Sequence, residues 1–241
     1  MIKIFLVSFL FFFLHVSGQY SSGVVEYGIK FNDDNHKKKF GQKRDQLTIS
    51  ESFRKKYGEI HRKFYAQDAV FIKLKFNKNS YYSEPVDVMI PESISGPYPD
   101  LISRNNVIYG DFKKKVFLFK TKTNQGEFVV KNKKNYCWVI KDEYRTIAGY
   151  KCRKAKMKFE NNPDEVLSIF EVWFTPEIPV AFSPVRYHGL PGAILGMKNF
   201  LHYIYAKEVI FTNDIKIEKP FSQEIISFEE YREIITRFKP D

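Results

Sequence analysis

Alternation of apolar and polar residues with a period of two constrains this fold more than any other feature. Apolar side chains occupy every second position of residues 70–76, and Lys73 and Lys75 stand between them. Successive side chains of a β-strand point to opposite faces, so the pattern predicts a half-buried strand. Lysines take every second place again near the end of residues 146–159, which we interpret as one longer strand.

Short apolar runs separated by turn residues extend this pattern over the chain. An aromatic content of 17% also favours strands. The remaining expected strands are residues 24–31, 80–83, 107–109, 116–121, 128–131, 136–141, 166–174, 194–197 and 203–212.

Two segments have helical patterns instead. Residues 50–64 repeat apolar side chains at helical spacing. The other helix begins near Ser227, and Glu230 three residues later completes a capping box. We therefore predict a mainly β (β-rich α+β) fold, a curved antiparallel sheet or partial barrel with one or two covering helices.

One position in this pattern calls for an irregularity. Tyr150 and Cys152 have the opposite parity from Ala155. If all three face inward, a β-bulge lies between them, near Arg153.

The N-terminus has the pattern of a secretory signal. Lys3 precedes an apolar run, and Val16 and Gly18 place small residues before a cut ahead of Gln19. The run is shorter than the roughly 20 apolar residues of a spanning helix. We expect residues 1–18 to be a signal peptide and residues 19–241 to be a single domain, soluble in the periplasm after cleavage, with no transmembrane segment.

The chain is basic, with a formal net charge of +11. Such a charge suits nucleic acid, anionic lipid or an acidic partner, or simply a lysine-rich solvated surface. Export and the absence of a nucleic-acid fold signature argue against nucleic acid. The solvated surface is the simpler of the remaining interpretations.

The two cysteines, Cys137 and Cys152, leave two interpretations open. An oxidising periplasm allows a disulfide between them. The alternative is two buried thiols on neighbouring strands.

A proline- and glycine-rich segment connects two of the expected strands. Pro191 and Gly192 suit the centre of a type II turn, and Pro176 and Pro179 stiffen the chain before it. Such a segment is either a rigid, packed connection or an ordered loop presented to a ligand or partner. The motif residues are Trp173, Pro176, Pro179, Gly189, Leu190, Pro191, Gly192 and Ile194.

These residues strongly resemble the GLPGLI family of exported proteins, although Ala193 stands where the name motif has Leu. The resemblance implies a signal peptide and no established enzymatic activity. It also implies an association with outer-membrane receptor components, because family members are often encoded beside them. It supplies no catalytic residue.

The sequence holds no catalytic, cofactor or metal motif that we would assign. His188 and His202 lie near the motif without metal-ligand spacing. We expect a non-catalytic binding or accessory protein at the outer membrane. The alternatives are a carrier of an apolar ligand and an enzyme of unrecognised type. The side chains expected to line a carrier's groove are Phe117, Phe119, Trp138, Trp173, Tyr203 and Tyr205.

Overall fold

The structure of the 241-residue chain is a computed structural model. It describes residues 22–32, 55, 59, 62–63, 66, 69–86, 107–123, 125–132, 136–158, 166–198 and 202–237. The predicted signal peptide lies outside these residues, and so does most of the helix predicted over residues 50–64. The four residues of that segment that are described, 55, 59, 62 and 63, are helical.

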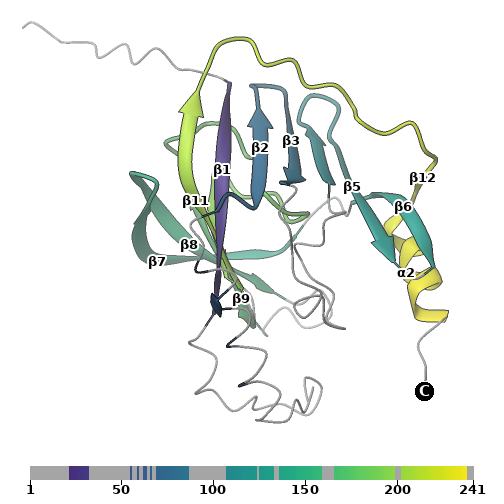
Figure 1. The fold of residues 1–241 in the computed structure, drawn as a ribbon, viewed down its shortest axis with the longest axis horizontal. Coiled ribbons are helices and arrows are strands. Elements are labelled where there is room, and N and C mark those ends of the chain that lie inside the picture. The colour runs from purple at the N-terminus through teal and green to yellow at the C-terminus, as the bar shows by residue number, and fades with distance from the viewer. Residues whose placement is uncertain are drawn as a thin grey trace, which may run out of the picture.

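The described strands form a single sheet (Figure 1). They are β1 (Gly23–Phe31), β2 (Ile72–Phe76), β3 (Ser80–Pro85), β4 (Val107–Asp111), β5 (Val116–Thr123), β6 (Gly126–Lys131), β7 (Trp138–Ile147), β8 (Tyr150–Lys158), β9 (Val166–Thr175), β10 (Ala193–Lys198), β11 (His202–Phe211) and β12 (Ile225–Ile226). Their order across the sheet is β12-β6-β5-β4-β3-β2-β1-β11-β10-β9-β8-β7. The prediction of a mainly β fold is confirmed, and the sheet is open, since β12 and β7 end it.

The first strand holds the two halves of the sheet together. β1 pairs with β2 on one side and with the late strand β11 on the other, both antiparallel. Most other neighbours are consecutive in sequence and antiparallel, whereas β12 runs parallel to β6. The two halves of the sheet therefore join only when β1 pairs with β11, and these strands are far apart in the sequence.

The segment predicted as one strand over residues 146–159 is a hairpin instead. β7 ends at Ile147 and β8 begins at Tyr150, and these two residues pair. Ala148 and Gly149 between them both have positive φ, 49° and 84°. Two such residues form the type I′ turn that joins twisted antiparallel strands.

The bulge predicted in β8 near Arg153 lies in the neighbouring strand. Ile140 of β7 pairs with Ala155 and Tyr144 pairs with Arg153, so three residues of β7 oppose one residue of β8. β8 itself keeps a regular register with β9 from Arg153 to Lys156.

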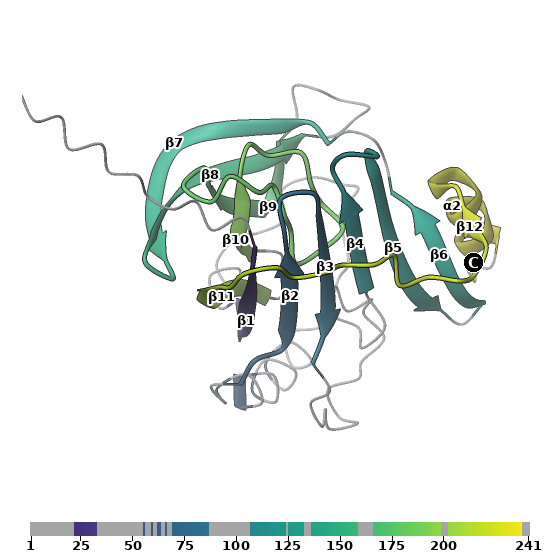
Figure 2. The same ribbon diagram turned by 90° about the horizontal axis from the view of Figure 1, so that it is seen from above.

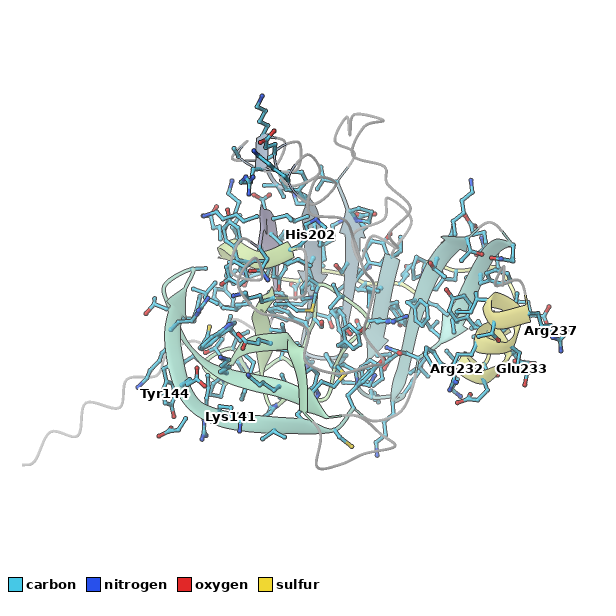
Figure 3. The ribbon with its side chains drawn as sticks, turned by 90° about the horizontal axis from the view of Figure 1, so that it is seen from below. Lys141, Tyr144, His202, Arg232, Glu233 and Arg237 are labelled. Atoms are coloured by element: carbon cyan, nitrogen blue, oxygen red, sulfur yellow. The ribbon has the colours of Figure 1, made fainter. Side chains whose placement is uncertain are left out.

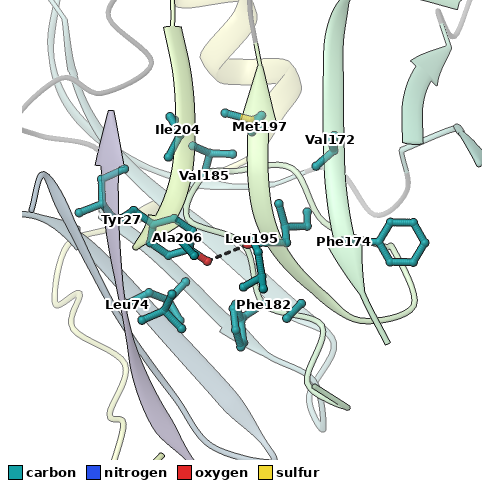
Figure 4. Close-up of a cluster of buried hydrophobic side chains, with 14 of the residues drawn as sticks. Tyr27, Leu74, Val172, Phe174, Phe182, Val185, Leu195, Met197, Ile204 and Ala206 are labelled. Carbon is teal, nitrogen blue, oxygen red and sulfur yellow. Dashed lines mark hydrogen bonds between the residues drawn. The ribbon is translucent and has the colours of Figure 1, made fainter. Parts of the chain in front are cut away.

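A large apolar core lies on one face of the sheet (Figure 4). Leu74 and Tyr27 contribute to it from the strands, and Phe182 and Val185 contribute from the connection between β9 and β10. The Tyr27 hydroxyl donates a hydrogen bond to the Ile194 carbonyl at 2.7 Å. Residues 176–192, which we call the motif segment, thus form the cover of this face.

The C-terminal helix is α2 (Phe228–Arg237). Its predicted capping box is confirmed: Glu230 N–H donates to the Ser227 hydroxyl at 3.1 Å, and Ser227 N–H donates to the Glu230 carboxylate at 2.7 Å. Tyr231 is its one buried residue, and the helix lies at the β6 end of the sheet (Figure 1). The prediction of covering helices is not supported.

An extended segment leads from β11 to β12 and crosses β2, β3 and β5 (Figure 2). Its Phe221 packs with Tyr109, Leu118 and Val129 in a second, smaller apolar cluster. The described part of the chain contains no helix long and apolar enough to cross a membrane.

The opposite end of the sheet curls strongly. Four strand spacings separate β7 from β11, about 19 Å in a flat sheet. Nevertheless, Arg145 of β7 donates a hydrogen bond to the Tyr203 hydroxyl of β11 at 3.4 Å. We call β7 to β11 the curled end of the sheet.

Candidate functional site

The motif residues divide between the core and the surface. Trp173, Leu190 and Ile194 are buried, with 3% exposure or less. The prolines and the first glycine of the motif are exposed instead; these are Pro176, Pro179, Pro191 and Gly189. The apolar half of the motif therefore anchors a connection whose three motif prolines face solvent.

Gly192 is the most constrained of these residues. Its φ is +144°, and a Cβ there would stand 2.1 Å from the Thr175 carbonyl oxygen. Its N–H donates to the Leu190 carbonyl at 2.9 Å, so a three-residue γ-turn is centred at Pro191. This hydrogen bond differs from that of the type II turn expected from the sequence.

The motif segment also contacts strands in both halves of the sheet. The Ser83 hydroxyl of β3 donates to the Pro184 carbonyl at 3.2 Å, and the Trp138 indole donates to the His188 carbonyl at 2.9 Å. The His188 ring stacks on Phe117 with centroids 3.9 Å apart. These contacts confirm a packed connection, because both its backbone and its side chains are engaged.

The two cysteines are both free. Cys152 is fully buried and Cys137 is exposed. Trp138, next to Cys137, pairs with Met157, five residues along β8 from Cys152. Five residues of strand span about 17 Å, far beyond the reach of a disulfide.

The aromatic side chains predicted to line one groove belong to two separate places. Phe117 and Trp138 contact His188 of the motif segment, while Tyr203 and Tyr205 lie on β11 at the curled end. Phe119 and Trp173 are each 3% exposed. These side chains therefore do not form a common ligand groove.

The curled end brings a set of cations and aromatic rings together. Register pairs place Trp173, Gly196, Tyr205 and Gly28 in one row across β9, β10, β11 and β1. Pairs in register share a face of the sheet, so the row is a continuous strip. The glycines leave room for rings: a Cβ on Gly28 would stand 2.9 Å from the Tyr205 ring.

Cations lie over the aromatic rings along this strip. Arg145 lies 4.0 Å from the Trp173 ring centroid and 5.6 Å from that of Tyr203. Tyr203 and Tyr205 stack at 5.6 Å, and Lys30 lies 4.7 Å from the Tyr205 centroid. All these distances are within the range of cation–π attraction and ring stacking. We name Lys30, Arg145, Trp173, Tyr203 and Tyr205 the cation–aromatic cluster.

The lysines beside the cluster are neutralised. Lys154 lies 2.9 Å from Glu143 and 3.0 Å from Glu171, and Lys156 lies 3.2 Å from Glu171. Burial works against the charge of Glu171, but the two lysines outweigh it and lower the pKa of that carboxyl. Likewise, burial opposes the charge on Lys154, and both carboxylates overcome it and raise its pKa.

Arg145 and Lys30 differ from these lysines. Within the described residues, the contacts of Arg145 are with aromatic groups, and Lys30 has its contact with the Tyr205 ring. Burial raises the pKa of Tyr203, and the Arg145 guanidinium partly offsets that effect. The cluster thus carries two accessible positive charges beside neutral phenols.

The sequence revealed no signal for this cluster. Tyr203, Tyr205 and Trp173 were predicted as apolar lining, while Arg145 and Lys30 were ordinary strand residues. No three His, Cys, Asp or Glu side chains in the described part gather as a metal site requires.

Comparisons with known proteins bear on the fold and the motif. Residues 160–196 match a family described as "Protein of unknown function (Porph_ging)", and this range contains the whole motif segment. No curated protein matches the chain.

Among solved structures, PNGF-II in a P21 crystal form resembles 90% of this chain at 14% identity with a TM-score of 0.53. A C2 form of the same protein gives a TM-score of 0.49. The chain covers only 33% of PNGF-II, so the similarity concerns the fold of one third of that protein.

Proposed function

We propose that this is an exported, non-catalytic protein of the GLPGLI type that binds a partner at the outer membrane. One observation carries the proposal. The motif segment packs against the core, whereas the edge strand β7 exposes large apolar side chains. Ile140 is 40% exposed and Tyr144 is 49% exposed.

The structure of the edge strand β7 favours a partner that binds its side chains over a partner that adds a strand to the sheet. The bulge between Ile140 and Tyr144 interrupts the regular edge, and Arg153 Nε donates to the Lys141 carbonyl at 2.9 Å. Bulges and charges are the usual protection of an edge strand against pairing. Figure 3 shows Lys141 and Tyr144 along the outer rim of the curled end.

Tyr144 and its neighbours make a compact contact surface. Lys151 lies 4.6 Å from the Tyr144 ring centroid and Arg153 lies 5.8 Å from it. An aromatic ring surrounded by cations is a typical interface anchor, because tyrosine and arginine are enriched in binding hot spots. The partner that fits this chemistry is a protein with an acidic, partly apolar surface.

The resemblance of the motif to the GLPGLI family supports this address and role. The GLPGLI-type motif implies export and association with outer-membrane receptor components. The family that matches residues 160–196 is itself of unknown function, and the match is consistent with a GLPGLI-type protein.

Site-specific photocrosslinking in living cells tests the proposal. Benzoylphenylalanine replaces Tyr144 in one variant and Lys113, in the exposed turn before β5, in the control. We expect a discrete adduct with an outer-membrane protein at position 144, which disappears when Ile140→Asp is added. The proposal fails if position 144 gives no adduct, or if position 113 gives the same one.

Fractionation tests the address separately. We expect the full chain in the periplasmic or outer-membrane fraction, and a chain lacking residues 2–18 in the cytoplasm. Cytoplasmic retention of the full chain would overturn the export part of the proposal.

A further inference from the structure

Beyond protein docking, we infer that the cation–aromatic cluster is a binding site for a small ligand that carries a phosphate or carboxylate on a ring. The site lies on the opposite side of β7 from Tyr144, because successive strand residues face opposite ways. The inference about this site can therefore be tested independently of the proposed function.

The first step of the argument concerns charge. Lys154 and Lys156, which flank the cluster on β8, each have a carboxylate within 3.2 Å. Arg145 and Lys30 are exposed and form no ion pair in the described part of the chain. Two unpaired cations within one cluster attract an anion, and the planar guanidinium can donate two parallel hydrogen bonds to a carboxylate or phosphate.

The second step concerns the rings. Tyr203 and Tyr205 are half-buried and stack with an interplanar angle of 18°. Tyr205 lies close over Gly28, so its ring is held against the sheet. Rings fixed in this way lose little conformational freedom on binding, which favours stacking of a second ring.

The third step concerns Trp173 beneath Arg145. Its indole is 3% exposed, and its N–H lacks a hydrogen-bond partner within the described residues. A buried donor without a partner is unusual in native proteins and often accompanies a functional site. The guanidinium that covers this indole is also the group that would contact the anion, so ligand binding changes the surroundings of Trp173.

The arrangement therefore fits a ligand with two parts. An anionic group contacts Arg145, a ring lies against the tyrosine stack, and Lys30 adds positive charge at the Tyr205 end of that stack. Both an aromatic phosphate and a sugar phosphate have this chemistry, and they differ in the flatness of the ring.

Titration of the purified protein tests the inference. Trp138→Phe leaves Trp173 as the only tryptophan, since the chain has two. The probes are phenyl phosphate, glucose 1-phosphate, inorganic phosphate and phenol, and Trp173 fluorescence is followed with each. We expect saturable changes with at least one of the two ring phosphates, at least tenfold tighter than with inorganic phosphate or phenol.

Variants assign the binding to the cluster. Arg145→Gln should weaken the ring phosphate at least tenfold, and Lys30→Gln about threefold, consistent with charged hydrogen bonds. Lys113→Gln, an equal loss of charge at a distant turn, should change affinity by less than about twofold.

Several results would overturn the inference. They are an absence of saturable binding by either ring phosphate, equal affinity for inorganic phosphate, and unchanged affinity in Lys30→Gln and Arg145→Gln alike. If only phenyl phosphate binds, the ligand ring is flat; if only glucose 1-phosphate binds, it is a sugar. Circular dichroism of each variant confirms that the fold is retained.

Discussion

The motif segment and the curled end both contain aromatic and basic side chains. In the motif segment the aromatic side chains are packed against other residues, whereas the cations at the curled end remain exposed. In the motif segment, His188 stacks on Phe117 and Phe182 is fully buried. At the curled end and on the adjoining β1, Arg145 and Lys30 lie over rings and remain exposed. The recognisable sequence motif thus marks packing, and the accessible chemistry lies in residues without a local pattern.

This difference predicts which substitutions affect stability and which affect binding. Changes in the motif segment should reduce the free energy of unfolding, because they open a filled core. Changes of Arg145 or Lys30 in the cation–aromatic cluster should affect binding and leave stability nearly unchanged, because both side chains are exposed.

The largest expected effect belongs to Gly192→Ala. The new methyl group would overlap the Thr175 carbonyl, and φ of +144° is unfavourable for alanine. We expect the free energy of unfolding to fall by about 4 kcal/mol or more, measured by urea denaturation.

Gly149→Ala is the matched control for this change. Its φ of +84° is also positive, but nothing lies within 4 Å of the added carbon. It should lower stability by about 1 kcal/mol. Equal losses in the two variants would show that strain, and not the close packing of the motif segment, determines the effect.

Phe182→Ala comes next. Phe182 is fully buried, and its ring centroid lies 4.6 Å from that of Phe76. Removing a buried ring should lower the free energy of unfolding by about 3 kcal/mol. Tyr144→Ala, on the exposed edge, should change it by less than about 0.5 kcal/mol. A loss below about 1 kcal/mol for Phe182→Ala would contradict the covering role of the motif segment.

Arg145→Gln should have a small effect on stability. It removes exposed cation–π contacts worth about 0.5–1 kcal/mol, while the binding of a ring phosphate should fall at least tenfold. A loss above about 2 kcal/mol in thermal unfolding would place Arg145 with the structural residues and remove the contrast between the two regions.

The smallest effect concerns the two thiols and requires no mutation, because one cysteine is buried and the other is exposed. Burial, assisted by nearby Glu177, raises the pKa of Cys152 from 9.0 to about 12. At pH 8 an aromatic disulfide reagent should therefore label one thiol, Cys137, and label both after denaturation. Rapid labelling of two thiols in the folded protein would show that the core is open.

The same shift has a consequence at high pH. Above pH 9 the unfolded thiol loses its proton, while folded Cys152 keeps it until about pH 12. The folded state should therefore lose stability over this window as pH rises.

Local patterns in the sequence predicted local structure well. The alternation around Lys73 and the capping box at Ser227 are both found in the structure, because each depends on residues a few positions apart. A packed Pro–Gly connection was one of the two alternatives predicted from the sequence. Its γ-turn was not, since that choice depends on the Thr175 carbonyl beside Gly192.

Non-local features escaped sequence analysis. The chain turns at Ala148, a residue without turn preference, which is why one long strand was predicted there. The approach of Arg145 to Tyr203 depends on the curl of five strands and on a register shift in β7. No spacing within the sequence encodes such a contact, so the cluster could be recognised only from the fold.

Amide hydrogen exchange of residues 176–192 tests the central claim most directly. The account predicts slow exchange for the hydrogen-bonded amides of Phe182 and Gly192, comparable to that of the core strand β10. Exchange as fast as that of Lys113, in the exposed turn before β5, would contradict it and would show that the motif segment is a presented loop.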